Sequence, residues 1–164
     1  MKGASDLPIE VDMILKSDMG KKEMEFLASF ARRVVKFTLQ KEGLREKDNE
    51  VSVLFTDDDF ISDLNEQYRG EGTPTDVLAF PMMDFEDAEN EIVIPGMPNV
   101  LGDIVVSLDT AASQAEAHGV PLRQELALLL IHGTLHLLGY DHDDPQKEAN
   151  MWARQEEILR QLNV

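Results

Sequence analysis

The sequence predicts an α+β fold, a single domain over residues 1–164 in which a mixed, four-stranded sheet packs with about five helices. The 164 residues are 43% hydrophobic, which suits one compact core. Segments with the two-residue period of strands and segments with the 3.6-residue period of helices follow each other without strict alternation. One later segment is apolar nearly all round, which indicates a central helix.

The first part of the chain predicts strand, helix, strand and helix in that order. Residues 9–15 partly alternate apolar with polar side chains, as a strand does, and residues 21–42 place apolar side chains at helical spacing. Residues 51–55 alternate again. Asp57 or Asp58 then caps a helix, because a short carboxylate can accept a hydrogen bond from the free amides of a first turn.

Two further strands are predicted at 77–82 and 103–107. The segment between them, 84–99, is rich in acidic residues and contains two prolines, so it predicts an exposed loop rather than a carboxylate metal site. Three helices complete the chain: from a cap at Ser107 or Asp109 to Ala117, from Pro121 to Gly139, and from Asp144 to Leu162.

The amino-acid composition excludes several kinds of site and binding partner. The chain has no cysteine, which excludes thiolate metal sites and disulfides. A net charge of −17 argues against non-specific binding to nucleic acid or anionic membrane. Six basic residues lie between 32 and 47, and they could form either a solvated helix face or a locally positive groove. No apolar run is long enough for a membrane span or signal peptide, so we expect a soluble, cytoplasmic protein without a membrane partner.

Three of the four histidines fall within eleven residues and predict a metal site. His132 and His136 are four residues apart on one helix, so both rings project from the same face. Gly139 can end this helix with a positive φ and let His142 turn back to the same ion. Three imidazoles leave a fourth zinc position for water, which is typical of catalytic zinc. His118, beside a helix end, is interpreted as structural.

The pattern HxxxHxxGxxH is that of metzincin metalloproteases, with one departure. The residue after the first histidine, their general-base glutamate, is Gly133 in this chain. Peptide hydrolysis by that route would lack its base. A metal-activated water or a polarised phosphoryl oxygen is still available to such a site.

The strings HGTLHLLGYDH at 132–142, LNEQYRGEGTPTDVLAFP at 64–81 and LGDIVVS at 101–107 closely resemble the bacterial YbeY family. This resemblance implies a single-domain, metal-dependent endoribonuclease that acts in maturation of the 16S ribosomal RNA 3′ end and in ribosome quality control. It implies that His132, His136 and His142 hold zinc. It also implies that Arg69 is the catalytic or RNA-binding arginine, whereas Thr75 and Asp76 receive no chemical role.

The leading hypothesis is therefore an endoribonuclease that cuts single-stranded RNA with one Zn²⁺ per chain, Ni²⁺ or Co²⁺ being the alternatives. Its expected partners are ribosomal RNA, the small ribosomal subunit, and ribosomal proteins or assembly factors. A second hypothesis is a non-catalytic ribosome-assembly factor with a structural metal, and a third is another metallohydrolase. The general base stays open between Asp141 and Glu125.

Overall fold

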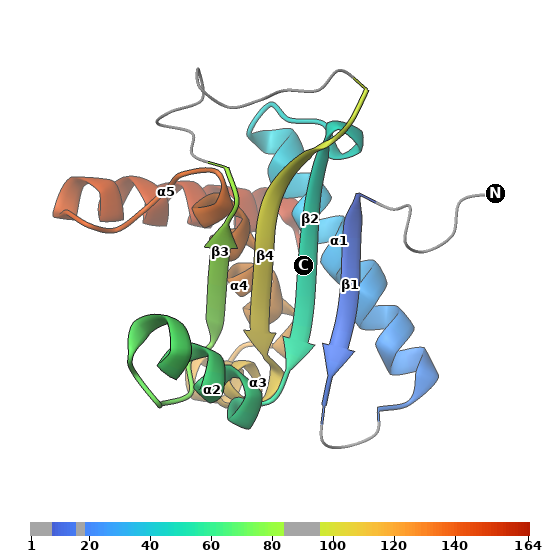
Figure 1. Ribbon diagram of the computed structural model, residues 1–164, viewed down its shortest axis with the longest axis vertical. Helices are drawn as coiled ribbons and strands as arrows, with labels where there is room; N and C mark the ends of the chain where they lie inside the picture. The colour runs from blue at the N-terminus through green and yellow to red at the C-terminus, as the bar shows by residue number, and fades with distance from the viewer. Residues whose placement is uncertain (1–7, 16–18, 84–95) are drawn as a thin grey trace.

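The computed structural model describes residues 8–15, 19–83 and 96–164. Five α-helices and four strands are present in these parts of the chain, as the sequence predicts (Figure 1). A short 3-10 turn, Glu46–Asp48, was not predicted. The elements are β1 (Ile9–Ile14), α1 (Lys21–Lys41), β2 (Asn49–Thr56), α2 (Asp58–Arg69), β3 (Val77–Pro81), β4 (Asn99–Ser107), α3 (Leu108–His118), α4 (Leu122–Leu137) and α5 (Pro145–Leu162).

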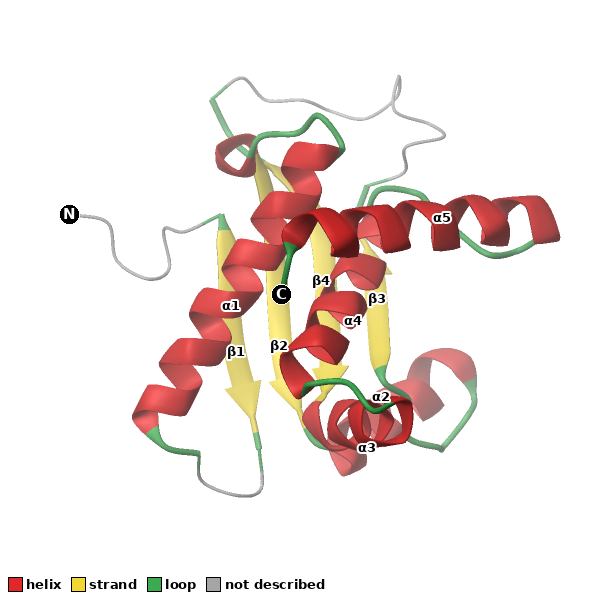
Figure 2. Cartoon of the chain, turned by 180° about the vertical axis from the view of Figure 1, so that it is seen from behind, coloured by secondary structure: helices red, strands yellow, loops and turns green. Residues whose placement is uncertain are grey.

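The four strands form one mixed sheet in the order β1-β2-β4-β3. The first three strands are parallel, and β3 runs antiparallel to β4 at the edge. Helices α1, α4 and α5 cover one face, whereas α2 and α3 lie at one end of the sheet (Figure 2). The α+β prediction is thus confirmed for the described residues, and the extent of the domain over 1–164 stays a prediction.

Helix α4 is the central element of the helical layer. It contacts α1, α3, α5, β3 and β4. Most of its residues are buried on every side, because its sequence is apolar nearly all round. The helix begins after Pro121 and ends at Leu137, and Gly139 follows with φ +99°, a conformation that favours glycine. The chain can therefore turn back at this point toward the end of the helix.

Three predicted side-chain caps are present at the helix starts. Asp57 accepts a hydrogen bond from the amide of Phe60, Ser107 from that of Thr110, and Asp144 from that of Lys147. Each satisfies an amide that the first helical turn leaves free. For α2 the cap is Asp57, whereas Asp58 accepts a hydrogen bond from the Ser107 hydroxyl.

Strand β4 is longer than the predicted 103–107, since it begins at Asn99. Its pairing with β2 shifts between Glu50 and Val51, opposite Gly102, which has φ +140°. A side chain at this glycine would collide with the carbonyl oxygen of Phe80. This irregularity hides the strand from a search for strict alternation. The predicted loop at 84–99 lies mostly outside the described residues; its last residue, Asn99, begins β4.

Four of the six basic residues between 32 and 47 have hydrogen-bond or ion-pair partners. Lys36 pairs with Glu46 at 3.1 Å, and Arg45 pairs with Asp48 at 2.6 Å. The guanidinium groups of Arg32 and Arg33 donate to the carbonyl oxygens of Ile9 and Leu162. These contacts favour the solvated, paired helix face. In the described parts of the chain, no helix combines the length and apolar character that a membrane span requires.

Helix α4 lies close to the sheet at Gly133. A Cβ atom placed there would lie 2.7 Å from Cγ2 of Ile104 in β4. We expect Gly133→Ala to lower the free energy of unfolding by about 1–2 kcal/mol, since overpacking outweighs the better helix propensity of alanine. Urea unfolding measures this change. Gly72→Ala, where an added Cβ would meet only the side chain of Glu66 at an ordinary 3.4 Å, is the control. Additive effects of Gly133→Ala and Ile104→Ala would contradict the steric explanation.

Candidate metal centre

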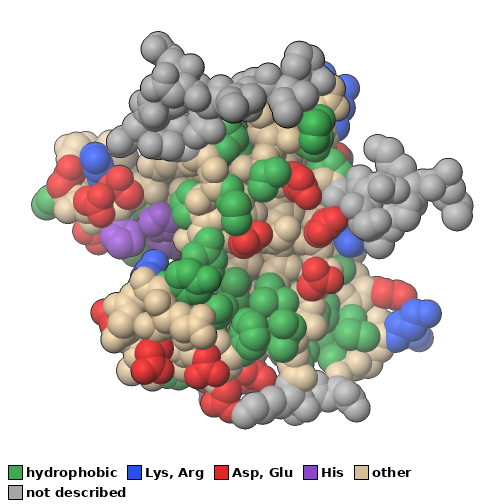
Figure 3. Space-filling model, viewed as in Figure 1, with side chains coloured by type: hydrophobic (Ala, Val, Ile, Leu, Met, Phe, Trp, Pro, Cys, Tyr) green, Lys and Arg blue, Asp and Glu red, His purple; other side chains and the backbone are tan. Residues whose placement is uncertain are grey.

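The three predicted histidine ligands meet at one place. His132 and His136 project from α4, and His142 follows the turn at Gly139. Their ring centroids are 4.7 Å apart for His132 and His136, 5.2 Å for His136 and His142, and 6.5 Å for His132 and His142. Histidine side chains gather at one margin of the molecule in Figure 3. The turn after α4 thus brings the third imidazole to the first two, as the spacing predicted.

A single ion would require one of the three rings to move. Three imidazole nitrogens at a tetrahedral zinc ion put the ring centroids roughly 5 Å apart. Two of the three separations are near this value, and the 6.5 Å between His132 and His142 is wider. In the described residues no three His, Asp or Glu side chains form a closed ligand set as they stand. His142, on the exposed loop, is the ring that would have to move.

Burial keeps two of the imidazoles neutral. Desolvation, together with the neighbouring His132, His142 and Arg69, lowers the pKa of His136 to about 4, against the opposing charge of Asp141. Desolvation also lowers the pKa of His132, against the opposing effect of its hydrogen bond to Gln155. Only a neutral imidazole has a free nitrogen lone pair for a metal. Both rings are therefore in the ligating form at pH 7.

Gln155 orients the first histidine. Its Oε1 atom lies 2.8 Å from Nδ1 of His132, so Nδ1 donates the hydrogen bond and Nε2 stays available. Gln155 comes from α5 and is 2% exposed. Gln155 was not predicted from the sequence. The available signal was a polar residue on the apolar face of α5, four residues after Met151.

A cavity of about 170 Å³ lies in front of the histidines. Arg69, at the end of α2, is part of its wall, and so are four residues from β3 and the segment before it: Thr75, Asp76, Val77 and Ala79. Gly70 ends α2 with φ +72°, immediately after the arginine. A guanidinium and three imidazoles thus surround one small space, although Arg69 and His132 are far apart in sequence.

Asp76 has a structural role that the structure makes clear. Its Oδ1 atom accepts a hydrogen bond from the amide of Val77 at 2.8 Å, which fixes the start of β3. With its amide group turned to satisfy its neighbours, Gln114 donates to both Asp76 and Glu125. Glu125 is buried and also lies 3.2 Å from Nδ1 of His118. Neither Glu125 nor Asp141 is part of the cavity wall, whose one carboxylate among the described residues is that of Asp76. Of the two predicted general-base candidates, Asp141 is the one whose charge acts on His136.

The close packing of α4 against β4 at Gly133 is incompatible with the metzincin glutamate at this position. Gly133 follows His132, and its missing side chain would meet Ile104 of β4. A glutamate at 133 would point into the contact between α4 and the sheet. The arrangement therefore has no room for the metalloprotease base at that position.

The comparisons with known proteins identify the family. A family model described as endoribonuclease YbeY matches residues 14–163. The chain belongs to the YbeY family. The endoribonuclease YbeY of Lysinibacillus sphaericus is 41% identical over 154 residues, which cover 93% of this chain and 98% of the relative. The endoribonuclease YbeY of Oceanobacillus iheyensis is 45% identical over 133 residues, covering 81% and 86% of the two chains.

A solved structure supports the fold of this YbeY family member. The solution structure of TM1509 from Thermotoga maritima has a TM-score of 0.56 and 30% identity, over 93% of this chain and 88% of that one. The predicted family is therefore confirmed, and with it the prediction of an enzyme from a nuclease family. The ligand set and the role of Arg69 stay predictions.

Proposed function

We propose that this YbeY family member is a zinc-dependent endoribonuclease that cleaves single-stranded RNA. The observation that carries the proposal is the convergence of three imidazoles and the Arg69 guanidinium on one cavity. Its place in the cell, in maturation of the 16S ribosomal RNA 3′ end and in ribosome quality control on the small subunit, is proposed from the family.

The proposed roles follow from the donor chemistry. His132, His136 and His142 would hold the ion, and Gln155 would keep the ring of His132 in its ligating orientation. When bound, the ion supplies Lewis-acid chemistry that lowers the pKa of a water or polarises a phosphoryl oxygen. Arg69 would bind the phosphate through two parallel hydrogen bonds and offset the charge that grows during phosphodiester cleavage. Asp141 is the proposed proton acceptor, since its negative charge acts on His136.

Metal removal tests this proposal directly. Nuclease-free protein stripped with a chelator is expected to lose cleavage of a ribosomal RNA fragment, and one equivalent of Zn²⁺ per chain should restore it. Parallel reloading with Ni²⁺ or Co²⁺ ranks the alternatives. The same fragment annealed to its complement is the substrate control and should resist cleavage. Cleavage that is equal in stripped and reloaded protein would contradict a metal-dependent nuclease.

One observation favours a second function. The net charge of −17 opposes extended contact with RNA and suits the basic surface of a ribosomal protein. In that case the chain would be an assembly factor with a structural metal. Cells that carry a stable variant with all three histidines replaced would then process ribosomal RNA normally. Loss of processing in those cells would favour the nuclease.

A further inference from the structure

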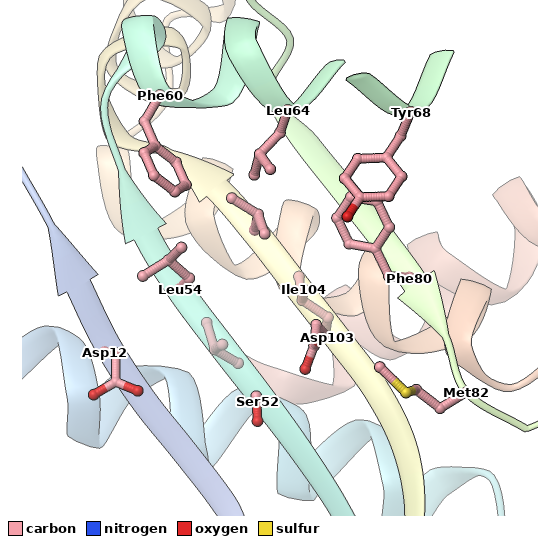
Figure 4. A pocket seen from close by; sticks show the side chains of 12 residues that line it. Asp12, Ser52, Leu54, Phe60, Leu64, Tyr68, Phe80, Met82, Asp103 and Ile104 are labelled. Atoms are coloured by element: carbon pink, nitrogen blue, oxygen red, sulfur yellow. The ribbon is translucent and has the colours of Figure 1, made fainter. Parts of the chain in front are cut away.

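The last turn of α2 points two neighbouring side chains to different places. Arg69 contributes to the histidine cavity, whereas Tyr68 contributes to a separate groove on the other face of the sheet. Consecutive helical residues are about 100° apart around the axis, which allows this division. Tyr68 is 66% exposed, and its ring meets Phe80 edge-on with centroids 5.0 Å apart and planes inclined at 60° (Figure 4).

The groove has a volume of about 460 Å³, within the range of small-ligand pockets. It lies over the sheet face that α1, α4 and α5 leave uncovered (Figures 1 and 4). Its wall near Tyr68 is apolar and includes Leu64 of α2 and Met82, which follows β3. Asp103, opposite Phe80 in the neighbouring strand, and the more distant Asp12 give the floor of the groove a negative charge. The space beside Tyr68 therefore suits an uncharged, flat group and repels a phosphate.

One edge strand separates this groove from the candidate metal centre. Ala79 faces the histidine cavity, and the next residue, Phe80, faces the groove, because successive side chains of a strand point to opposite faces. In Figure 3 the histidine side chains lie beside a patch of hydrophobic ones on the same view of the molecule. A single-stranded chain with its phosphate at Arg69 can thus extend over β3 to the aromatic pair.

We propose that Tyr68, braced by Phe80, is a stacking subsite for an unpaired RNA base next to the nucleotide whose phosphate binds Arg69. This inference rests on the proposed function. Every nucleobase offers a flat π face, so such a subsite binds single strands with little sequence preference. In a duplex both faces of each base are already stacked, so the subsite also gives a physical reason for single-strand specificity.

The affinity for a cleavage-resistant oligonucleotide tests the subsite. Zinc-loaded protein is titrated into a fluorescent 2′-O-methyl phosphorothioate RNA, and anisotropy gives the dissociation constant. We expect Tyr68→Ala to weaken binding about tenfold or more, as the loss of one stacked base does. Tyr68→Phe and Tyr68→Trp should retain affinity, because they keep the flat ring. Phe26→Ala is the matched control: Phe26 is 58% exposed and stacks on Phe30 in α1, which covers the opposite face of the sheet.

An abasic scan of the oligonucleotide locates the partner base. Removal of the base at one position should weaken binding to the wild-type protein as much as Tyr68→Ala does. The same abasic oligonucleotide should bind the Tyr68→Ala variant no more weakly than the intact one does. If Tyr68→Ala and wild type bind the oligonucleotide with equal affinity, the proposed subsite is wrong. An apolar protein segment would then be the expected ligand of the groove. A loss in Tyr68→Phe as large as in Tyr68→Ala would overturn the subsite too, because the hydroxyl would then be the binding group. If the wild type neither binds nor cuts single-stranded RNA, the proposed function itself fails.

Discussion

Replacing His136 by alanine is expected to weaken both zinc binding and RNA cleavage by about two to three orders of magnitude. Among the described residues, the cavity is lined by no imidazole besides those of His132, His136 and His142, and the low pKa of His136, about 4, makes it a ligand that protons do not compete for at pH 7. Loss of a residue that only supports a metal ligand lowers metal affinity by up to about 100-fold. Loss of the ligand itself should lower the zinc affinity by more than this. Cleavage should fall about a thousandfold, since a metal supplies several kcal/mol to such a reaction. Metal analysis after dialysis and a cleavage assay measure the two losses.

His118→Ala is the control for this experiment. It removes the same side chain from the end of α3, where His118 pairs with Glu125 and is not part of the cavity wall. Zinc content and cleavage should both stay near the wild-type values. A His136→Ala protein that keeps one zinc per chain would show that the ion binds elsewhere. Cleavage that persists without zinc would point to a contaminating nuclease.

Replacing Arg69 by alanine should separate the two properties, with cleavage lost and zinc retained. The guanidinium contributes to the cavity wall but is no metal ligand, and it lies near enough to His136 to depress the pKa of that ring. Removal of one donor that stabilises a developing negative charge costs about a hundredfold to a thousandfold in rate. Arg69→Lys should recover only part of this loss, because an ammonium cannot form two parallel hydrogen bonds.

Arg123→Ala provides the matched loss of an exposed positive charge, in the first turn of α4. It should cleave at the wild-type rate when the salt concentration is held constant. If Arg69→Ala and Arg123→Ala lose activity equally, the effect is one of overall charge and not of a phosphate contact. If Arg69→Ala also loses its zinc, the arginine supports the metal centre and the two roles cannot be separated in this way.

Local signals predicted most of the fold because the chain marks its elements clearly. Short polar side chains cap α2, α3 and α5, and the amphipathic or wholly apolar patterns between the caps have unambiguous periods. The short start of β4 was missed because a register shift interrupts its alternation. Such an irregularity depends on the partner strand, β2, and a single segment does not reveal it.

The histidines could be predicted together because their spacing is local: one helical turn and one tight turn place all three. Arg69 and Gln155 come from α2 and α5, and only tertiary packing brings them to the same centre. Periodicity gives no information on such contacts. For Arg69 the resemblance to a known family supplied the prediction, and for Gln155 a polar residue on an apolar helix face was the one available signal.

The close contact of Gly133 with Ile104 also bears on how this enzyme's chemistry could change in evolution. Gly133→Glu would place the catalytic carboxylate of metzincins next to His132, but its Cβ alone already meets β4. The first substitution on that route would therefore yield a destabilised protein before any new activity could be selected. If a smaller residue replaced Ile104 first, it would leave a cavity in the core, which is also destabilising. Core packing thus separates this scaffold from peptidase chemistry by at least two substitutions, each harmful when it occurs alone.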